Sequence, residues 1–382
     1  MNRLLTPPGE LDLVRFPVDP RADLRAWDAA DEYVLRELGG VDLSGAVVVL
    51  GDRWGALTTA LAAYRPTLVT DSHLAMEATR ENLRRAGVAP EDVRLLTTQD
   101  VPPDVIDVLV VRVPKSLALL EDQLHRLAPA THAGTVVVGT GMVKEIHTST
   151  LELFERILGP TRTSLAERKA RLIHCVPDPA LVRPANPWPR THALPADVGA
   201  VSGLTVTNHA GVFSAERLDI GTRFLLQHLP VRSGAEHVVD LGCGNGVVGL
   251  AAALGNPAAE VTFVDESFQA VASAEATVRA NAPQVKTHFL VRDGLVGQPP
   301  ASVDLVLNNP PFHVHQATGD ATAWRMFTAA RAALRPGGEL WVVGNRHLGY
   351  HVKLRKLFGS CDLVASNPKF VILRAVRTGV LR

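Results

Sequence analysis

The stretch Val238-Val-Asp240-Leu-Gly242-Cys-Gly244-Asn-Gly246 decides the fold of the second half of this 382-residue chain. An apolar run that ends in a carboxylate and three closely spaced glycines predicts a strand, a tight turn and then a helix over Val247 to Leu254. Glycines in such a turn let backbone N–H groups and the helix N-terminus approach a bound ligand closely. The stretch therefore predicts a ligand site at the end of a strand.

The glycine turn is compatible with two cofactors. Gly244-Asn-Gly246-Val-Val-Gly249 matches the dinucleotide fingerprint, and Asp265 lies about twenty residues further on, where an NAD-binding acid belongs. The order of the other motifs separates the two cofactors. After Asp240 and the turn come Asp265 at the end of the next apolar run, Asp293-Gly294 after a third, and Asn309-Pro310-Pro311-Phe312 after a fourth. This succession resembles the class I S-adenosylmethionine-dependent methyltransferases.

The Asn309-Pro310-Pro311-Phe312 turn suits a planar amine as substrate. The carboxamide oxygen of Asn309 and the carbonyl of Pro310 can accept both hydrogens of an exocyclic amine and favour the positive charge that develops on its nitrogen. The prolines fix the backbone that aims these acceptors, and Phe312 offers a face on which a base can stack. An ordinary turn after a strand is the alternative interpretation of the same residues.

Composition is typical of a folded protein with a sizeable core, since 46% of the residues are hydrophobic and 20% are charged. No run approaches the roughly eighteen apolar residues of a membrane span, and the N-terminus lacks a signal-peptide core, so we expect a cytoplasmic protein. The formal net charge is zero, so a polyanion would be held by local patches. Cys175, Cys243 and Cys361 are scattered and odd in number, which argues against a disulfide framework and against a metal site.

Prolines cluster between residues 177 and 195 and place a domain boundary there. We expect one domain over residues 1–185, a Pro-rich linker over 177–195 and a second domain over 196–382. Downstream, apolar runs at 288–291, 303–307 and 339–343 alternate with helical patterns at 268–281 and 321–334. This alternation predicts an α/β domain with a parallel sheet whose ligand binds at the carboxyl ends of the strands.

The first half repeats the plan of the second. The stretches 46–55, 67–71, 107–115 and 134–139 mirror the glycine turn, the strand ending at Asp265, the Asn-Pro-Pro segment and the strand before Gly344, with offsets of about 190 to 205 residues. An internal duplication therefore predicts two tandem Rossmann-like class I methyltransferase folds. In the first copy Asp52, Arg53 and Trp54 occupy the turn and Arg112-Val-Pro-Lys115 replaces the catalytic segment. We expect this copy to lack the cofactor site and to hold substrate, with a plain scaffold as the alternative.

The whole chain resembles the bacterial large-subunit (23S) rRNA guanine-N2 methyltransferases of the RlmG type, with the small-subunit enzymes of the RsmC type as close relatives. The matching stretches are Arg15-Phe-Pro17, Trp27-Asp-Ala-Ala-Asp-Glu-Tyr33, Val113-Pro-Lys115, His147-Thr-Ser-Thr-Leu-Glu-Leu-Phe154, Val212-Phe-Ser214, Leu218-Asp-Ile-Gly221, Asn309-Pro-Pro-Phe-His313 and Asn345-Arg-His347. The resemblance implies an active C-terminal domain beside an inactive N-terminal one. It also implies large-subunit rRNA, free of protein or early in assembly, as the partner of a chain that we expect to be monomeric.

Roles for individual residues follow from this resemblance. It implies that Gly242, Gly244 and Gly246 line the methionine and ribose end of S-adenosylmethionine, that Asp240 holds the turn, and that Asn309 adjoins the cofactor. Asp265 would bind the ribose hydroxyls and Asp293 the adenine amine. The implied catalytic residues are Asn309, Pro310 and Phe312, with no metal. Phe213 and Ser214 form either a lid over the site or an ordinary capping loop.

A guanine can present its amine only when it is unpaired or flipped out, so the protein must grip RNA elsewhere. The candidate clamps are Arg156, Arg162, Arg168, Lys169 and Arg171 in the first half and Arg346, His347, Lys353, Arg355 and Lys356 in the second. Guanine-N2 methylation of small-subunit rRNA is the alternative within the same family. Three other functions use parts of the same motif set. They are adenine-N6 methylation of nucleic acid, N5 methylation of a protein glutamine, and RNA binding by a scaffold with a vestigial cofactor site.

Overall fold

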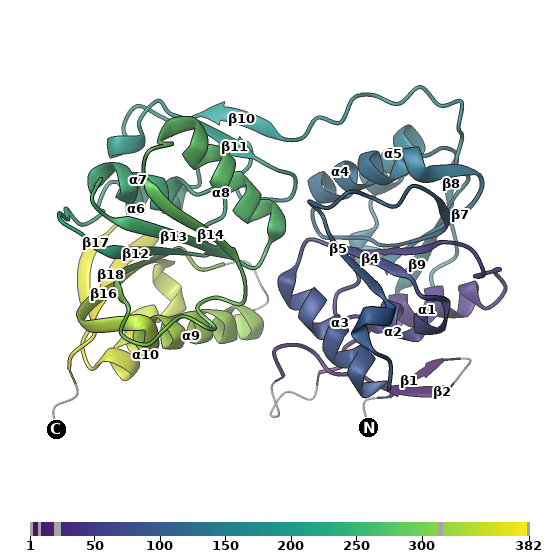
Figure 1. The fold of residues 1–382 in the computed structure, drawn as a ribbon, viewed down its shortest axis with the longest axis horizontal. Coiled ribbons are helices and arrows are strands. Elements are labelled where there is room, and N and C mark those ends of the chain that lie inside the picture. Colours follow the sequence, from purple (N-terminus) through teal and green to yellow (C-terminus); the bar gives the residue numbers. More distant parts are fainter. Residues whose placement is uncertain (1–2, 7–8, 19–23, 312–315, 380–382) are drawn as a thin grey trace. The chain divides into compact units, whose positions relative to one another are not determined.

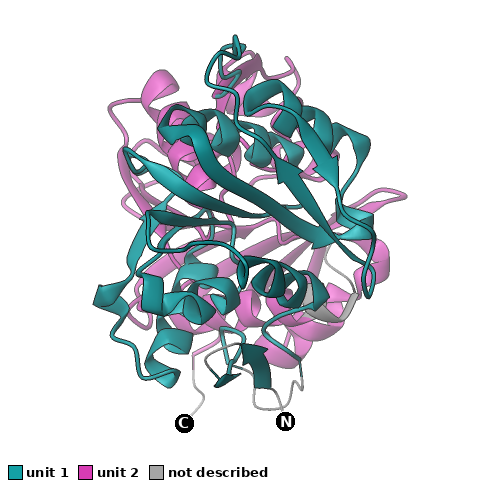
Figure 2. Ribbon diagram, turned by 90° about the vertical axis from the view of Figure 1, so that its right-hand side faces the viewer, with its two compact units in different colours: residues 1–188 teal, residues 189–382 magenta. Residues whose placement is uncertain are grey.

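Two compact units make up the chain, Met1–Trp188 and Pro189–Arg382 (Figure 2). The structure is a computed structural model that describes residues 3–6, 9–18, 24–311 and 316–379, with backbone only for residues 316–320. Each unit contains a seven-stranded sheet with helices on both faces (Figure 1). Because each sheet is covered on both sides, its central strands are almost wholly apolar and buried.

The sheet of unit 2 has the strand order β14-β13-β12-β15-β16-β18-β17. Its first five strands are parallel, and β18 is antiparallel to both of its neighbours. The strands are β12 (His237–Leu241), β13 (Glu260–Asp265), β14 (Lys286–Val291), β15 (Val303–Asn308), β16 (Leu334–Asn345), β17 (Asp362–Ser366) and β18 (Phe370–Val376). The helices are α6 (Ile220–Leu226), α7 (Val247–Gly255), α8 (Phe268–Asn281), α9 (Gln316–Ala333), η6 (Arg346–Leu348) and α10 (Tyr350–Phe358).

Antiparallel strands at the C-terminal end differ from the wholly parallel sheet that the sequence predicts. Only three residues separate β17 from β18, and the Asn367 side-chain oxygen accepts hydrogen bonds from the backbone N–H of Lys369 at 2.9 Å and of Phe370 at 2.7 Å. A connection this short can join only antiparallel neighbours, because a parallel pair needs a crossover of a dozen residues or more. The sheet is therefore mixed.

Unit 1 repeats the same strand order, β5-β4-β3-β6-β7-β9-β8. Its strands are β3 (Val47–Leu50), β4 (Thr67–Thr70), β5 (Arg94–Thr97), β6 (Ile106–Arg112), β7 (Thr131–Met142), β8 (Thr161–Thr163) and β9 (Ala170–Cys175), and β1 (Arg3–Thr6) pairs with β2 (Gly9–Asp12) beside them. The helices are α1 (Ala29–Leu38), α2 (Ala56–Ala60), η1 (Ala62–Tyr64), α3 (His73–Arg85), η2 (Pro90–Asp92), α4 (Leu117–Leu127), η3 (Ala128–Ala130), η4 (Val143–Glu145) and α5 (Thr148–Ile157). The predicted fold class, two tandem Rossmann-like α/β folds, is confirmed.

Sheet register aligns the two copies residue by residue. Leu50 pairs with Val69 and Val111 in unit 1, and Leu241 pairs with Val264 and Asn308 in unit 2. One position further along each strand, Arg112 therefore takes the place of Asn309, and Thr70 takes the place of Asp265. The internal repeat in the sequence aligned the end of stretch 67–71, Asp71, with Asp265. That alignment is wrong by one residue. The first copy has a threonine where the second has its strand-terminal carboxylate.

A two-stranded ribbon precedes the sheet of unit 2. β10 (Arg190–Ala193) pairs with β11 (Thr205–Asn208), and η5 (Gly199–Val201) lies between them. Two backbone N–H groups fasten the ribbon to α8: those of Thr207 and His209 donate to the side-chain oxygens of Thr277 at 3.0 Å and Ser273 at 2.8 Å. Residues 190–193, which the sequence assigned to the linker, are thus part of the second unit. No helix among the described residues is long and apolar enough to cross a membrane.

Candidate functional site

The glycine turn between β12 and α7 lies at the point where the sheet order reverses, between β12 and β15. Gly242, Gly244 and Gly246 have φ angles of 75°, 53° and 80°, a region that glycine adopts without strain. A Cβ on Gly246 would lie 2.8 Å from the Cα of Ala274 in α8, whereas a Cβ on Gly244 would meet nothing within 4 Å. Gly246 therefore allows close helix packing, and Gly244 leaves open space for a ligand.

Asp265, the last residue of β13, is bound to the turn. Its Oδ2 accepts a hydrogen bond from the backbone N–H of Gly244 at 3.0 Å, and its Oδ1 accepts one from the backbone N–H of Ser267 at 3.1 Å. Burial raises the pKa of this carboxyl, and the backbone N–H donors oppose that rise. Each carboxylate oxygen has a second lone pair, so both can still accept from a vicinal diol.

Asp240 is the next-to-last residue of β12, bonded to the first turn of α7, and is only 3% exposed. Its Oδ2 accepts the backbone N–H of Gly249 at 2.8 Å. Burial raises the pKa of Asp240 to about 8, with a further contribution from the charge of Asp265, although the Gly249 N–H opposes it. This carboxyl fastens the helix behind the turn, so its effect on a ligand would be through the position of the backbone.

Asn308 is the last residue of β15, and Asn309 follows it beside the glycine turn. The Nδ2 of Asn308 donates to the carbonyl of Leu241 at 2.7 Å, and the Nδ2 of Asn309 donates to the Thr222 hydroxyl at 2.9 Å. The Oδ1 atoms of both residues are buried and have no hydrogen-bond partner among the described residues. Because buried oxygens are rarely left unpaired, the Asn309 acceptor is free to receive a hydrogen bond from a ligand beside the glycine turn.

Two predicted site residues are not among these contacts. Asp293, expected near the adenine, lies beyond β14, and its Oδ1 is 3.4 Å from the Arg325 guanidinium. Phe312, like His313 after it, lies outside the described residues, whereas Pro310 before it is buried. The structure thus brings the glycine turn and Asp265 into direct contact and sets Asn309 at the end of the adjacent strand.

Thr222 and Asp219 are contacts of the site that the sequence did not predict. Asp219 is the N-cap of α6, and Thr222 is the third residue of that helix. An N-cap aspartate can be read from sequence, but a hydrogen bond between residues 87 positions apart cannot. A third such residue is Asn208, whose Oδ1 accepts from the Asn245 side chain in the glycine turn at 2.9 Å.

Charged side chains occupy the equivalent region of unit 1. Arg112, 1% exposed, contacts Asp28 at 2.7 Å, Asp31 at 3.1 Å and Glu145 at 3.1 Å. Arg53, in the place of Gly244, contacts Glu145 at 2.8 Å. Burial alone would raise the pKa of Glu145, but the hydrogen bond from Arg53 and the charges of Arg112 and Arg53 lower it to about 2.

A small cavity lies at the same end of the sheet of unit 1. This cavity of about 20 Å³ lies at the carboxyl ends of β3, β4 and β6, lined in part by Gly51, Thr70 and Pro114. That volume holds about one water molecule. Asp52, in the turn itself, is buried and accepts hydrogen bonds from the backbone N–H of Gly55 at 3.1 Å and of Thr58 at 2.8 Å. The prediction that the first copy does not bind a nucleoside is consistent with these side chains.

A mixed seven-stranded sheet with a glycine turn at its switch point and an Asn-Pro-Pro segment on the next strand defines a class I methyltransferase. The sheet of unit 1, where ion pairs occupy the region of the turn, makes the chain a two-domain member of that class. Family models agree: residues 1–179 match the RLMG N-terminal domain and residues 203–374 match the methyltransferase small domain. The chain belongs to the ribosomal RNA large subunit methyltransferase G family.

Named relatives match the chain from end to end. Ribosomal RNA large subunit methyltransferase G of Streptomyces avermitilis is 74% identical over 98% of this chain and 99% of the relative. The protein of the same name from Stutzerimonas stutzeri is 47% identical over 99% and 100%. The solved structure of Thermus thermophilus 16S rRNA N2 G1207 methyltransferase (RsmC), in complex with AdoMet and guanosine, has a TM-score of 0.78 at 23% identity, covering 98% of this chain and 97% of that one. At that identity the likeness shows the fold.

Proposed function

We propose that this chain transfers a methyl group from S-adenosylmethionine to the N2 amine of a guanine in large-subunit (23S) rRNA. One observation carries the proposal. The buried Oδ1 of Asn309, unpartnered among the described residues, lies at the end of the strand next to the glycine turn. An acceptor beside a cofactor cleft suits a donor substrate, and an exocyclic amine is such a donor.

The residues present fit S-adenosylmethionine. The open space at Gly244 and its left-handed turn admit the methionine end, and both oxygens of Asp265 can accept from the ribose hydroxyls. Asp293, held 3.4 Å from Arg325, retains lone pairs for the adenine amine. When bound, this cofactor supplies an electrophilic methyl group on a sulfonium centre. Asp240 contributes by fixing the start of α7.

Asn309 and Pro310 would act on the amine itself. The Asn309 Oδ1 and the Pro310 carbonyl accept one N–H each, which orients the nitrogen lone pair toward the methyl group. As the nitrogen becomes positive, both acceptors gain strength, so they stabilise the transition state more than the ground state. The methylated nitrogen is acidic enough to lose its proton to water, so positioning and charge stabilisation suffice without a side-chain base.

A second unpartnered oxygen favours guanine over adenine. The Oδ1 of Asn345, at the end of β16, is buried without a partner among the described residues. Alternate residues of a strand face the same side of the sheet. Asn345 therefore faces the same side as Trp341 and Val343 of β16. Asn309, just past β15, continues the alternation of Leu305 and Leu307, which face that side too. Guanine presents N1–H beside its N2 amine, whereas adenine presents an acceptor nitrogen beside its N6 amine. An acceptor on this face that receives N1–H would therefore match guanine and not adenine.

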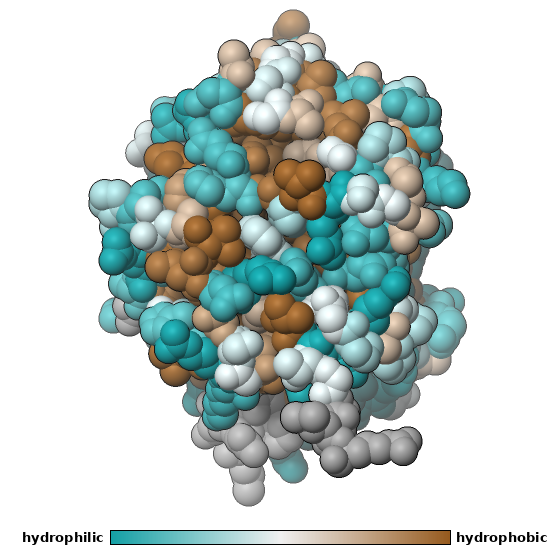
Figure 3. Space-filling view, turned by 90° about the vertical axis from the view of Figure 1, so that its left-hand side faces the viewer, coloured by the Kyte–Doolittle hydropathy of each residue, from teal (hydrophilic) through white to brown (hydrophobic). Residues whose placement is uncertain are grey.

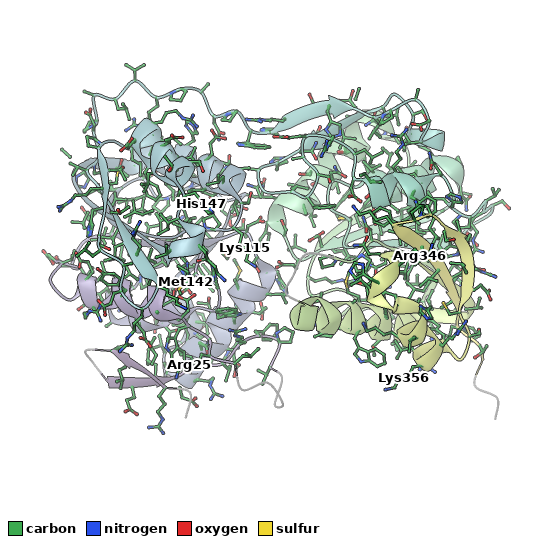
Figure 4. The ribbon with its side chains drawn as sticks, turned by 180° about the vertical axis from the view of Figure 1, so that it is seen from behind. Arg25, Lys115, Met142, His147, Arg346 and Lys356 are labelled. Atoms are coloured by element: carbon green, nitrogen blue, oxygen red, sulfur yellow. The ribbon has the colours of Figure 1, made fainter. Side chains whose placement is uncertain are left out.

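The RNA partner would be gripped along the carboxyl-terminal edges of the sheets. In unit 1 the backbone N–H of Val143 donates to the carbonyl of Lys169, which sets Lys144 and Lys169 on this edge. Both side chains are exposed and have no ion-pair partner among the described residues. Two residues labelled in Figure 4 lie on the same edge. Lys115 follows strand β6, and Met142 is the last residue of the adjacent strand β7.

Unit 2 has the same local arrangement. The backbone N–H of Arg346 donates to the carbonyl of Lys369, and His347 follows Arg346 in the short helix η6 (Figure 4). Cations on the catalytic edge are placed to neutralise phosphates near the target base. Elsewhere, the face of unit 2 in Figure 3 mixes hydrophilic residues with small, separate apolar groups, which is typical of a solvated surface.

Two of the predicted clamps already have acidic partners. Arg156 contacts Glu121 at 2.7 Å and Arg168 contacts Glu32 at 2.9 Å. A phosphate would have to displace these carboxylates, so they contribute less to RNA binding than unpaired lysines. Lys169 is the predicted clamp of unit 1 that the geometry favours.

Nucleoside analysis of the product tests the proposal. Purified protein and labelled S-adenosylmethionine are incubated with protein-free rRNA from cells that lack the protein, and the RNA is digested. Label in N2-methylguanosine from large-subunit RNA is expected. Label in methyladenosine contradicts the assignment of the base, label in small-subunit RNA contradicts the choice of subunit, and label in protein alone contradicts the substrate class. Asp265→Ala should weaken cofactor binding in calorimetric titration.

A further inference from the structure

The Asn309 side chain belongs to a relay of three residues. Asp219 Oδ2 accepts hydrogen bonds from the backbone N–H of Thr222 at 2.8 Å and from its hydroxyl at 3.3 Å. The same hydroxyl oxygen accepts from the Nδ2 of Asn309 at 2.9 Å. The relay therefore runs from a carboxylate through a hydroxyl to a carboxamide.

The relay has a fixed polarity. An ionised carboxylate only accepts, so the single hydroxyl hydrogen of Thr222 is directed to Asp219. The lone pairs of the hydroxyl then face Asn309 and select the NH2 end of its carboxamide. Rotating the carboxamide by 180° would set its oxygen against those lone pairs. The Oδ1 is thereby kept on the opposite side, where it has no partner among the described residues.

We propose that Thr222 and Asp219 are positioning residues that hold the Asn309 carboxamide with its oxygen toward the substrate amine. This inference rests on the proposed function. Without the hydroxyl the carboxamide can turn and present its own NH2 group to the amine, so that two donors face each other. A smaller fraction of bound substrate would then be oriented for methyl transfer, so turnover would fall, while the glycine turn and Asp265 would stay in place.

Unit 1 supports the pairing of these positions independently. Arg112 takes the place of Asn309 by sheet register, and its Nε lies 3.1 Å from Asp31 Oδ1. Asp31 is three residues after the N-cap of α1, Asp28, as Thr222 is three residues after the N-cap of α6. Both copies thus join the helix residue to the strand-end residue. In unit 2 the helix residue is a hydroxyl and its partner a carboxamide. In unit 1 the helix residue is a carboxylate and its partner a guanidinium, so both members of the pair differ between the units.

The relay also predicts why an asparagine stands at position 309. A carboxylate at position 309 could also accept a hydrogen bond from the substrate amine, just as the carboxamide oxygen does. In Asn309→Asp, however, the introduced carboxylate and that of Asp219 would compete for the one hydroxyl hydrogen of Thr222, and one of the two would face a lone pair. We therefore expect Asn309→Asp to lose turnover despite retaining acceptor oxygens.

Thr222→Val in the full chain tests the relay, because valine keeps the shape and the backbone N–H that Asp219 caps. Methylation of protein-free rRNA should show kcat lower by roughly fivefold to tenfold, the worth of one neutral hydrogen bond. The KM for RNA, the Kd for S-adenosylmethionine and the melting temperature should stay close to wild type. Thr222→Ser keeps the hydroxyl and should recover most of the turnover.

Three results would overturn the inference. They are a wild-type kcat in Thr222→Val, equal impairment in Thr222→Ser, or a parallel loss of cofactor binding, which would assign Thr222 a structural role. Failure of the proposed function would look different, because the wild-type protein itself would then give no N2-methylguanosine.

Discussion

Removing Arg112 should destabilise unit 1 strongly. Its side chain is 1% exposed and contacts three carboxylates, those of Asp28, Asp31 and Glu145, at 2.7 to 3.1 Å. In Arg112→Met the apolar part of the side chain remains, but Asp31 loses its only basic partner among the described residues, since Arg53 contacts Asp28 and Glu145. Breaking a buried ion pair by removing one partner typically costs about 3–5 kcal/mol.

Melting of the full chain by scanning calorimetry provides the measurement. For a unit of 188 residues each kcal/mol corresponds to roughly 2–4 °C, so the transition of unit 1 should fall by roughly 6–20 °C. The matched control is Arg36→Met in the same helix as Asp31. Arg36 and its partner Glu167 are 56% and 47% exposed, and exposed pairs contribute about 0–1 kcal/mol.

The pH dependence checks the cause. Burial, against the charge of Arg112, raises the pKa of Asp31 to about 7, and removing Arg112 should raise this pKa further. When the pKa of a carboxyl is higher in the folded than in the unfolded protein, the protein loses stability as the pH rises from the unfolded pKa to the folded pKa. The variant should therefore be less destabilised at pH 6 than at pH 8. A melting temperature like that of the control at both pH values would refute the reasoning, and the Arg112 network would then be dispensable.

Four further expectations concern the cofactor, the amine acceptor, RNA and pH. Calorimetric titration should find one S-adenosylmethionine per chain, and two would contradict the closure of unit 1. Asn309→Ala should lower turnover by about a hundredfold with cofactor Kd nearly unchanged; near-normal turnover would make the segment structural. Lys144→Gln with Lys169→Gln should lower the slope of log K against log salt by roughly 1 to 2, whereas Arg94→Gln at the opposite edge of the sheet should not. Asp240, whose pKa is raised to about 8, costs stability as pH rises from about 4 to 8; Asp240→Asn should flatten the pH dependence of the urea midpoint, and an unchanged profile would refute the raised pKa.

Local sequence patterns were sufficient to predict the strand, turn and helix around the glycines. β12, the left-handed glycines and α7 follow from an apolar run, three glycines and a second apolar run, all within twenty residues. The internal repeat predicted the fold of unit 1, because the same strand and turn motifs recur at a nearly constant offset in the sequence. Both signals depend on neighbours in the chain, and both are reliable for that reason.

Contacts between distant residues were beyond the sequence. The Thr222 to Asn309 bond joins residues 87 positions apart, and the ion pairs of Arg156 and Arg168 span 35 and 136 positions. Both arginines are candidate RNA clamps from the sequence, which does not reveal that each has a carboxylate partner in the fold. The one-residue error at Asp71 has a similar cause, since only sheet register tells Thr70 from Asp71 as the counterpart of Asp265.

Comparison of the two copies suggests what catalysis requires of this fold. Unit 2 leaves the Oδ1 atoms of Asn308 and Asn309 buried and unpaired among the described residues, and each unpaired acceptor costs about 1–3 kcal/mol. Unit 1 satisfies the same region with Arg112 and its carboxylates. A site that waits for a donor substrate must keep acceptors free, so it gives up stability that a non-catalytic copy can recover. Binding of a guanine to unit 2 would then supply the hydrogen bond missing at Asn309, and stabilisation of unit 2 by substrate should exceed that produced by an analogue lacking the N2 amine.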